Sequence, residues 1–252
     1  MPIFDDSTMQ GHALAGTGYG FSARRIEDLG ASEYTLCVIA CDTSGSVAAF
    51  QGELERAVKE VVKTCRKSPR ADNLMLRLVT FDDDVKEQHG FRPLTECDLD
   101  KYDGCVRIGG MTALYDAAVN AVSSVVAYGE QLTRQDYGVN AVVFVLTDGG
   151  DNKSKLTPDE IRRAVEEAVK GEALESILTV LIGVNVQDAQ ISQYLKALQK
   201  SARFDQYVEL KDANEKTLAK LARFVSHSIS SQSQALGTGG PSRAISPAAF
   251  SI

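Results

Sequence analysis

The stretch YTLCVIACDTSGS, from Tyr34 to Ser46, limits most strongly what this chain can fold into. Its apolar half, Leu36 to Cys41, has the length and composition of a strand that is buried on both faces of a sheet. The turn that follows carries one carboxylate and three hydroxyls, and an amphipathic helical pattern begins directly after it. Because ligands of open α/β sheets bind at the carboxyl ends of the strands, this turn is a candidate site.

Three side chains of that turn, Asp42, Ser44 and Ser46, alternate along the chain and can converge on one point. Short oxygen ligands beside a carboxylate suit Mg²⁺ or another hard divalent ion. The sequence therefore predicts a cation site at the end of the first buried strand.

Apolar strands and amphipathic helices alternate along the rest of the chain, which predicts an α/β fold with a doubly wound, mainly parallel sheet flanked by helices. One strand, residues 85–94, is expected to fold back as a hairpin and to form an antiparallel edge strand, because Pro93 lacks the N–H that a central strand needs. The other expected elements are strands 36–41, 73–82, 137–146, 177–184 and 204–210 and helices 47–65, 113–128, 157–170, 188–200 and 217–229.

The two ends of the chain differ in composition from the middle. Residues 1–32 are rich in glycine and other small residues and show no sustained period, which predicts an N-terminal arm that wanders or lies on the surface. Residues 231–252 are rich in Ser, Gln, Gly and Pro, a composition typical of a flexible C-terminal tail. The folded domain is therefore expected to span residues 33–230.

Two further polar loops are expected near the first one. Asp148, within Thr147-Asp148-Gly149, follows another buried strand directly, so it is predicted at the same rim of the sheet as Asp42. Thr112 ends the loop Gly109-Gly110-Met111-Thr112 and opens a helix that starts from this rim. With Ser44 and Ser46, these side chains supply three hydroxyls and two carboxylates, which fill most of an octahedral shell.

The three loops together resemble the von Willebrand factor type A family. Asp42-Thr43-Ser44-Gly45-Ser46 matches the D-x-S-x-S motif of that family, the loop ending in Thr112 is similar to its metal-binding threonine loop, and Thr147-Asp148-Gly149 is similar to its third element. The order and spacing of the elements agree over about residues 33–230. All three motifs on the right strands make the resemblance specific, whereas D-x-S-x-S alone is weak.

The resemblance implies a metal-ion-dependent adhesion site that holds Mg²⁺, or in its place Mn²⁺ or Ca²⁺. Ser44, Ser46 and Thr112 would be direct ligands, whereas Asp42 and Asp148 would act directly or through water. In such sites one coordination position stays open for an Asp or Glu side chain of a protein partner. The implied function is a non-catalytic, metal-dependent protein-protein interaction module, and no residue is assigned a catalytic role.

Other interpretations of the same residues remain open. Ser and Asp are common at turns and helix N-caps. A Mg²⁺-dependent hydrolase or phosphatase also places a metal at the end of a first strand, but Ser44 occupies the position where such enzymes carry a second Asp for proton transfer. A structural component of a large particle, bound through its arm and tail, is a third alternative. Asp151 is expected to be a turn residue, and Tyr115 and Asp116 are assigned no role.

Composition narrows the partners and the compartment. The net charge of −7 argues against direct nucleic-acid binding. The sequence shows no signal-peptide pattern and no apolar window long enough to span a membrane. The five cysteines lack C-x-x-C spacing, which favours buried, reduced thiols. We therefore expect a cytoplasmic protein without membrane contact. Intracellular relatives work beside AAA+ ATPases of the MoxR type or in stress-response or phage-defence assemblies, so the resemblance implies a partner of that kind.

Overall fold

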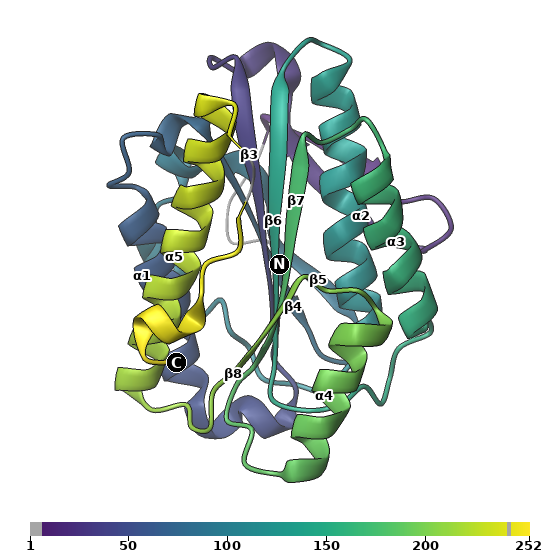
Figure 1. The fold of residues 1–252 in the computed structure, drawn as a ribbon, viewed down its shortest axis with the longest axis vertical. Helices are drawn as coiled ribbons and strands as arrows, with labels where there is room; N and C mark the ends of the chain where they lie inside the picture. The colour runs from purple at the N-terminus through teal and green to yellow at the C-terminus, as the bar shows by residue number, and fades with distance from the viewer. Residues whose placement is uncertain (1–6, 241–242) are drawn as a thin grey trace.

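The computed structural model describes residues 7–240 and 243–252. Within these ranges the strands form one eight-stranded sheet in the order β1-β2-β5-β4-β3-β6-β7-β8 (Figure 1). The strands are β1 (Met9–Ala13), β2 (Gly20–Arg24), β3 (Glu33–Asp42), β4 (Leu74–Phe81), β5 (Val85–Pro93), β6 (Gly138–Thr147), β7 (Ser176–Gly183) and β8 (Gln206–Glu209). The α-helices are α1 (Gln51–Cys65), α2 (Leu114–Thr133), α3 (Pro158–Lys170), α4 (Ala189–Ser201) and α5 (Glu215–Thr238).

The centre of the sheet is parallel and covered on both faces. Strands β4, β3, β6, β7 and β8 pair in parallel, and among the described strands only β4–β5 and β1–β2 pair antiparallel. Helices α1 and α5 lie on one face, whereas α2, α3 and α4 lie on the other (Figure 1). The predicted fold class, a mainly parallel, doubly wound sheet with an antiparallel edge, is confirmed.

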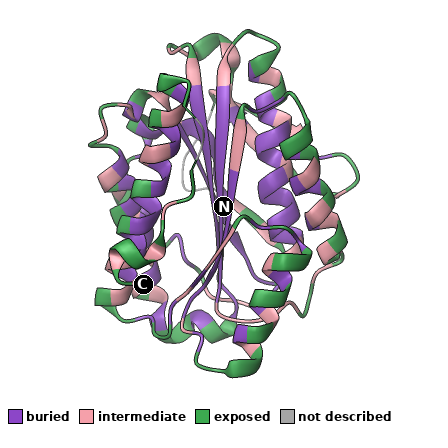
Figure 2. Ribbon diagram, viewed as in Figure 1, coloured by how far each residue is buried: buried purple, intermediate pink, exposed green. Residues whose placement is uncertain are grey.

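The apolar run of β3 is divided between two cores. Leu36, Val38 and Ala40 pack with α2, whereas Cys37, Ile39 and Cys41 pack with α1 and α5. Successive side chains of a strand point to opposite faces, so a strand covered on both sides must be apolar throughout. Figure 2 shows the buried strands between helices whose outer faces are exposed. All five cysteines are buried and free.

The N-terminal segment differs from its prediction. Residues 9–13 and 20–24 form an antiparallel hairpin, and β2 joins β5 in parallel, with Ala23 opposite Phe91. The interpretation of residues 1–32 as an arm on the surface is therefore replaced, within the described residues, by two strands of the main sheet. Strand β5, predicted at the edge because of Pro93, lies inside the sheet, and β1 forms that edge.

A buried arginine and its carboxylate partner help to hold the hairpin on the sheet. Arg77 on β4 is fully buried; its Nε donates to Glu87 at 2.6 Å and its guanidinium also donates to the Gly20 carbonyl at 3.4 Å. Glu87 accepts hydrogen bonds from the Ser22 backbone and hydroxyl. A buried charge is tolerated only when it is paired and hydrogen-bonded, and β2 supplies part of that pairing. The close approach of β2 also explains Gly90, where a Cβ would lie 2.1 Å from the Ser22 carbonyl oxygen.

The C-terminal segment also differs from its prediction. The last helix, expected to end near residue 229, continues to Thr238 and ends at Gly239, whose φ is +64°. Residues 243–252 then pass beside α5 (Figure 1). The Phe250 ring meets Phe224 edge-on at 5.9 Å, and Lys220 donates to the Ser251 carbonyl at 3.0 Å. The expected flexible tail from residue 231 is thus partly helix and partly a segment packed on α5. In the described part of the chain, no helix is both long enough and apolar enough to cross a membrane.

Candidate metal centre

The first and third polar loops meet because β3 and β6 are adjacent and parallel. Their register places Cys41 opposite Leu146, so Asp42 and Thr147 end the two strands side by side. The Thr147 hydroxyl donates to Asp42 Oδ2 at 2.7 Å. This contact ties the turn after β3 to the turn that carries Asp148.

Four of the five predicted residues are joined by hydrogen bonds. The Ser44 amide donates to Asp42 Oδ1 at 2.8 Å, and the Ser44 and Ser46 hydroxyl oxygens lie 3.2 Å apart. The Ser46 hydroxyl donates to Asp148 Oδ1 at 2.8 Å. Ser44 is extended, and the short 3₁₀ helix that begins at Gly45 turns the chain back, so that both serines face the same point. We call the series Asp42–Ser44–Ser46–Asp148 the polar row.

Thr112 reaches the same rim through its backbone. The Gly109 amide donates to the Thr43 carbonyl at 2.9 Å, and the Gly45 amide donates to the Gly110 carbonyl at 3.2 Å. Thr112 itself is 5% exposed. Among the described residues its hydroxyl forms no hydrogen bond with the polar row, so its place in the site comes from the loop and not from a direct side-chain contact.

Glycine is required at one position of this loop. Gly110 has a φ of +43°, and a Cβ there would lie 2.2 Å from the Asp83 carboxylate. The same carboxylate accepts a hydrogen bond from the Met111 amide at 3.0 Å. The turn at residues 82–84, which joins β4 to β5, therefore also supports the threonine loop.

The two carboxylates of the polar row lack a cationic partner. Asp42 is 1% exposed, whereas Asp148 is partly exposed, and neither carboxylate forms an ion pair with any described residue. The pKa of Asp42 is raised to about 6, chiefly because burial disfavours its charged form and also because Asp148 is near, while hydrogen bonds from Ser44 and Thr147 act in the opposite direction. Burial likewise raises the pKa of Asp148, against a hydrogen bond from Ser46.

This donor set fits a hard divalent cation. A buried carboxylate at Asp42 beside the partly exposed carboxylate of Asp148, with no counter-ion, is energetically costly, and a bound cation removes that cost. Within the part of the chain that the structure describes, no three His, Cys, Asp or Glu side chains cluster as a metal site. The side-chain atoms available as ligands at the rim are therefore hydroxyl and carboxylate oxygens, which suit Mg²⁺ or Mn²⁺ better than softer metals.

Comparison with known families decides the identity of the fold. The family described as von Willebrand factor type A domain matches residues 37–223. The chain belongs to this family. Domains of the family are typically non-catalytic protein-interaction modules with a metal-ion-dependent adhesion site. The polar row and Thr112 all lie within the matched residues.

Solved structures share this fold. The PilB minor pilin from Streptococcus sanguinis is 16% identical with a TM-score of 0.58, and the match covers 89% of this chain and 67% of the pilin. The mussel byssus protein PTMP1, with a zinc-occupied adhesion-site motif, is 19% identical with a TM-score of 0.51 over 80% of this chain and 46% of its own. BatB from Bacteroides thetaiotaomicron is 14% identical with a TM-score of 0.50, over 77% of this chain and 98% of its own.

These likenesses concern the fold alone, because every identity is low. The chain spans less than half of the mussel protein. No curated protein matches it in sequence. Assignments of individual residues at the rim therefore rest on the geometry of this chain.

Several residues around the site were not identified by sequence analysis. Thr147 holds Asp42, and Asn152 accepts from the Thr112 amide at 2.7 Å. Asp116, which was assigned no role, is 1% exposed and accepts hydrogen bonds from three groups on other segments. The position of Asp116 four residues after Thr112, on the buried side of α2, was the available signal. Asp151 accepts from the Ser154 hydroxyl at 2.5 Å, as expected of a turn residue.

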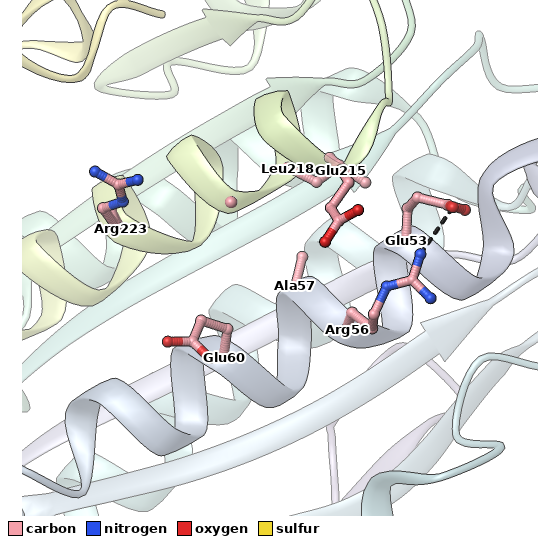
Figure 3. A pocket seen from close by; sticks show the side chains of 8 residues that line it. Glu53, Arg56, Ala57, Glu60, Glu215, Leu218 and Arg223 are labelled. Atoms are coloured by element: carbon pink, nitrogen blue, oxygen red, sulfur yellow. Dashed lines mark hydrogen bonds and ion pairs between the residues drawn. The ribbon is translucent and has the colours of Figure 1, made fainter.

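A groove between α1 and α5 lies outside the polar row (Figure 3). Its polar lining mixes both charges, and Arg56 is paired with Glu53 at 2.8 Å. Such a lining selects no single ligand chemistry. The groove is lined by Glu53, Arg56, Ala57, Glu60, Glu215, Leu218, Ala219 and Arg223.

Proposed function

We propose that this chain is a non-catalytic protein-interaction module in which Ser44, Ser46 and Thr112, with Asp42 and Asp148, hold a divalent cation. Mg²⁺ is the expected ion, and Mn²⁺ and Ca²⁺ are its alternatives. When bound, the ion supplies an electrophilic position for an Asp or Glu side chain of a partner protein. The observation that supports the proposal is the hydrogen-bonded polar row, which ends in the buried Asp42 and the partly exposed Asp148, neither of which has a counter-ion among the described residues.

The choice of side chains favours capture of a carboxylate. Neutral hydroxyls cancel little of a cation's charge, so the ion keeps its attraction for an incoming anion. Hydrogen bonds also hold the two carboxylates in place: the Ser44 amide and the Thr147 hydroxyl fix Asp42, and the Ser46 hydroxyl fixes Asp148. Groups held in place before binding lose less conformational freedom when the partner arrives.

The net charge of −7 adds a condition on the partner. An acidic side chain approaches a protein of like sign, so its attraction to the surface must come from the cation at the rim. We propose that the partner belongs to a multi-protein assembly in the cytoplasm, with a MoxR-type AAA+ ATPase as the first candidate by family analogy.

Hydrolysis is less well supported by the residues at the rim. Proton transfer in a metal phosphatase needs an acid–base group beside the nucleophile, and Ser44 holds that position. The three histidines are engaged elsewhere. His89 is buried and hydrogen-bonded to Tyr102 at 2.8 Å, His12 lies beside Gln131, and His227 packs against Phe250.

The test compares partner capture by the immobilised chain in Mg²⁺ and in EDTA. Ser44→Ala is expected to abolish the Mg²⁺-dependent capture and leave the fold intact. Ser226→Ala is the matched control, because this buried serine donates only to the Ala222 carbonyl within α5. A captured partner must then lose binding when one of its Asp or Glu residues is changed to Asn or Gln.

Two results oppose the proposal. Capture that survives both EDTA and Ser44→Ala would show that the metal plays no part. Mg²⁺-dependent phosphate release from a general phosphatase substrate, lost in Ser44→Ala but not in Ser226→Ala, would favour the hydrolase.

A further inference from the structure

Asp116 joins three segments that are distant in the sequence. It lies in the first turn of α2, four residues after Thr112, and is 1% exposed. Its Oδ1 accepts from the Leu156 amide at 2.8 Å and from the Lys155 amide at 3.1 Å. Its Oδ2 accepts from the Tyr19 hydroxyl at 2.7 Å. One buried carboxylate thus connects α2, the loop that follows β6, and the N-terminal hairpin.

The loop that follows β6 is the loop that carries Asp148. It is fixed to the start of α2 at a second point, where Asn152 Oδ1 accepts from the Thr112 amide at 2.7 Å and the Asn152 amide donates to the Thr112 carbonyl at 3.1 Å. The Ser154 hydroxyl also accepts from the Asp116 amide at 3.1 Å. Two of the three predicted metal-binding loops are therefore held as one unit.

We propose that Asp116 is a positioning residue for the metal centre: it fixes the Asp148 loop on α2, the helix that follows Thr112, with Tyr19 of the hairpin holding the carboxylate from the other side. The proposal rests on the function proposed above. Three donors converge on Asp116, and an ionised carboxylate, which only accepts hydrogen bonds, satisfies all of them. Partners behind metal ligands orient those ligands, and their loss typically weakens metal binding by about 10- to 100-fold.

The experiment measures Mn²⁺ binding to the full chain by electron paramagnetic resonance, with the fold verified by circular dichroism. Asp116→Ala removes all three acceptor contacts and is expected to weaken Mn²⁺ binding about tenfold. Asp116→Asn keeps a carbonyl oxygen for the two amides and is expected to restore most of the affinity. Should Asp116→Ala fail to fold, Tyr19→Phe removes one donor and is expected to weaken binding about threefold.

Asn140→Ala is the matched control. Asn140 is equally buried, accepts from the Thr35 hydroxyl at 2.7 Å and donates to the Gln232 carbonyl at 2.8 Å, at the amino end of β6 and away from the rim. Its loss should lower the stability of the fold and leave Mn²⁺ affinity unchanged. Hydrogen exchange at the Lys155 and Leu156 amides should accelerate in Asp116→Ala and not in Asn140→Ala.

Equal Mn²⁺ affinity in wild type and in a folded Asp116→Ala or Tyr19→Phe variant would overturn the proposal, as would an equal loss in Asn140→Ala. The function proposed above fails in a different way. Wild type that binds Mn²⁺ but captures no carboxylate-bearing partner would refute the interaction role and leave the positioning role standing. Wild type that binds no Mn²⁺ would overturn both.

Discussion

Replacing Asp42 with Asn should stabilise the metal-free protein at pH 8 and abolish its stabilisation by Mg²⁺. Burial raises the pKa of Asp42 from its ordinary 3.8 to about 6, so the folded state binds a proton more tightly than the unfolded state. The free energy of unfolding of the metal-free protein therefore falls as the pH rises from about 4 to 6. Above that window the ionised carboxylate costs about 3 kcal/mol.

The expected gain is smaller than this cost, because Asn accepts fewer hydrogen bonds. Its carbonyl oxygen can still accept from the Ser44 amide, and its amide group can donate to the Thr147 hydroxyl oxygen. The Thr147 hydroxyl can in turn donate to the Gly149 carbonyl, which lies 3.1 Å away. The changed contact with Thr147 costs about 1 kcal/mol. Asp42→Asn should therefore gain about 2 kcal/mol at pH 8 and nothing at pH 4.

Urea unfolding in EDTA at pH 4 and pH 8 measures this difference between the two proteins. The two proteins must be compared with each other, because a second buried group, His89, changes the stability of both over the same pH range in the opposite sense. Subtracting one stability from the other removes this shared contribution. At pH 8, Mg²⁺ at about 100 times its dissociation constant should stabilise the wild type by about 2.7 kcal/mol and the variant hardly at all. A variant no more stable than wild type at pH 8 in EDTA, or equally altered at both pH values, would refute the reasoning.

Three further perturbations test the rest of the fold. Burial lowers the pKa of His89 to about 4, so its protonation should remove about 3 kcal/mol of stability as the pH falls from 6.5 to 4, and His89→Gln should flatten this slope in urea titrations. Arg77→Ala leaves the Glu87 carboxylate without its partner and should cost about 3 kcal/mol or more in urea unfolding, whereas the double change Arg77→Met with Glu87→Gln should cost less. Phe250→Ala removes the edge contact with Phe224 and should cost about 1 kcal/mol; trypsin cleavage after Arg243 should accelerate, and an unchanged cleavage rate would contradict the packing of this segment.

The centre of the fold could be predicted because the sequence shows both the apolar pattern of the strands and the positions at which they end. The run from Leu36 to Cys41 is apolar at every position, and such runs occur where helices cover both faces of a sheet. Parallel strands end at one rim, so Asp42 and Asp148 could be placed together without knowing the register. Thr112 could also be placed at this rim, because a helix that starts from the rim follows it in the sequence. Whether these five side chains bind a metal is still a prediction.

The ends of the chain were harder to predict for a physical reason. Strand β2 is short and has only two apolar side chains, Phe21 and Ala23, and its Gly20 serves a close approach to the His12 carbonyl and not packing. The signal for a missing strand lay elsewhere, in Arg77, which interrupts the apolar stretch of β4. A fully buried guanidinium requires acceptors from neighbouring segments: β5 and α2 provide most of them, and the hairpin adds the Gly20 carbonyl. At the C-terminus, the packed residues are spread over a polar segment, which hides them from any periodicity.

Two acidic regions of the sheet differ in how their charge is balanced. Glu87 is neutralised internally by Arg77, so the N-terminal hairpin is held by a charge pair that is complete without any ligand. Asp42 and Asp148 receive hydroxyls and an amide but no basic side chain among the described residues, which leaves their charge to a bound cation. A lysine or arginine at Ser44 or Ser46 would stabilise the metal-free protein by the same electrostatics and would occupy the place of the ion. The absence of such a cation lowers the stability of the metal-free fold, and that deficit becomes the energy with which a divalent ion is held.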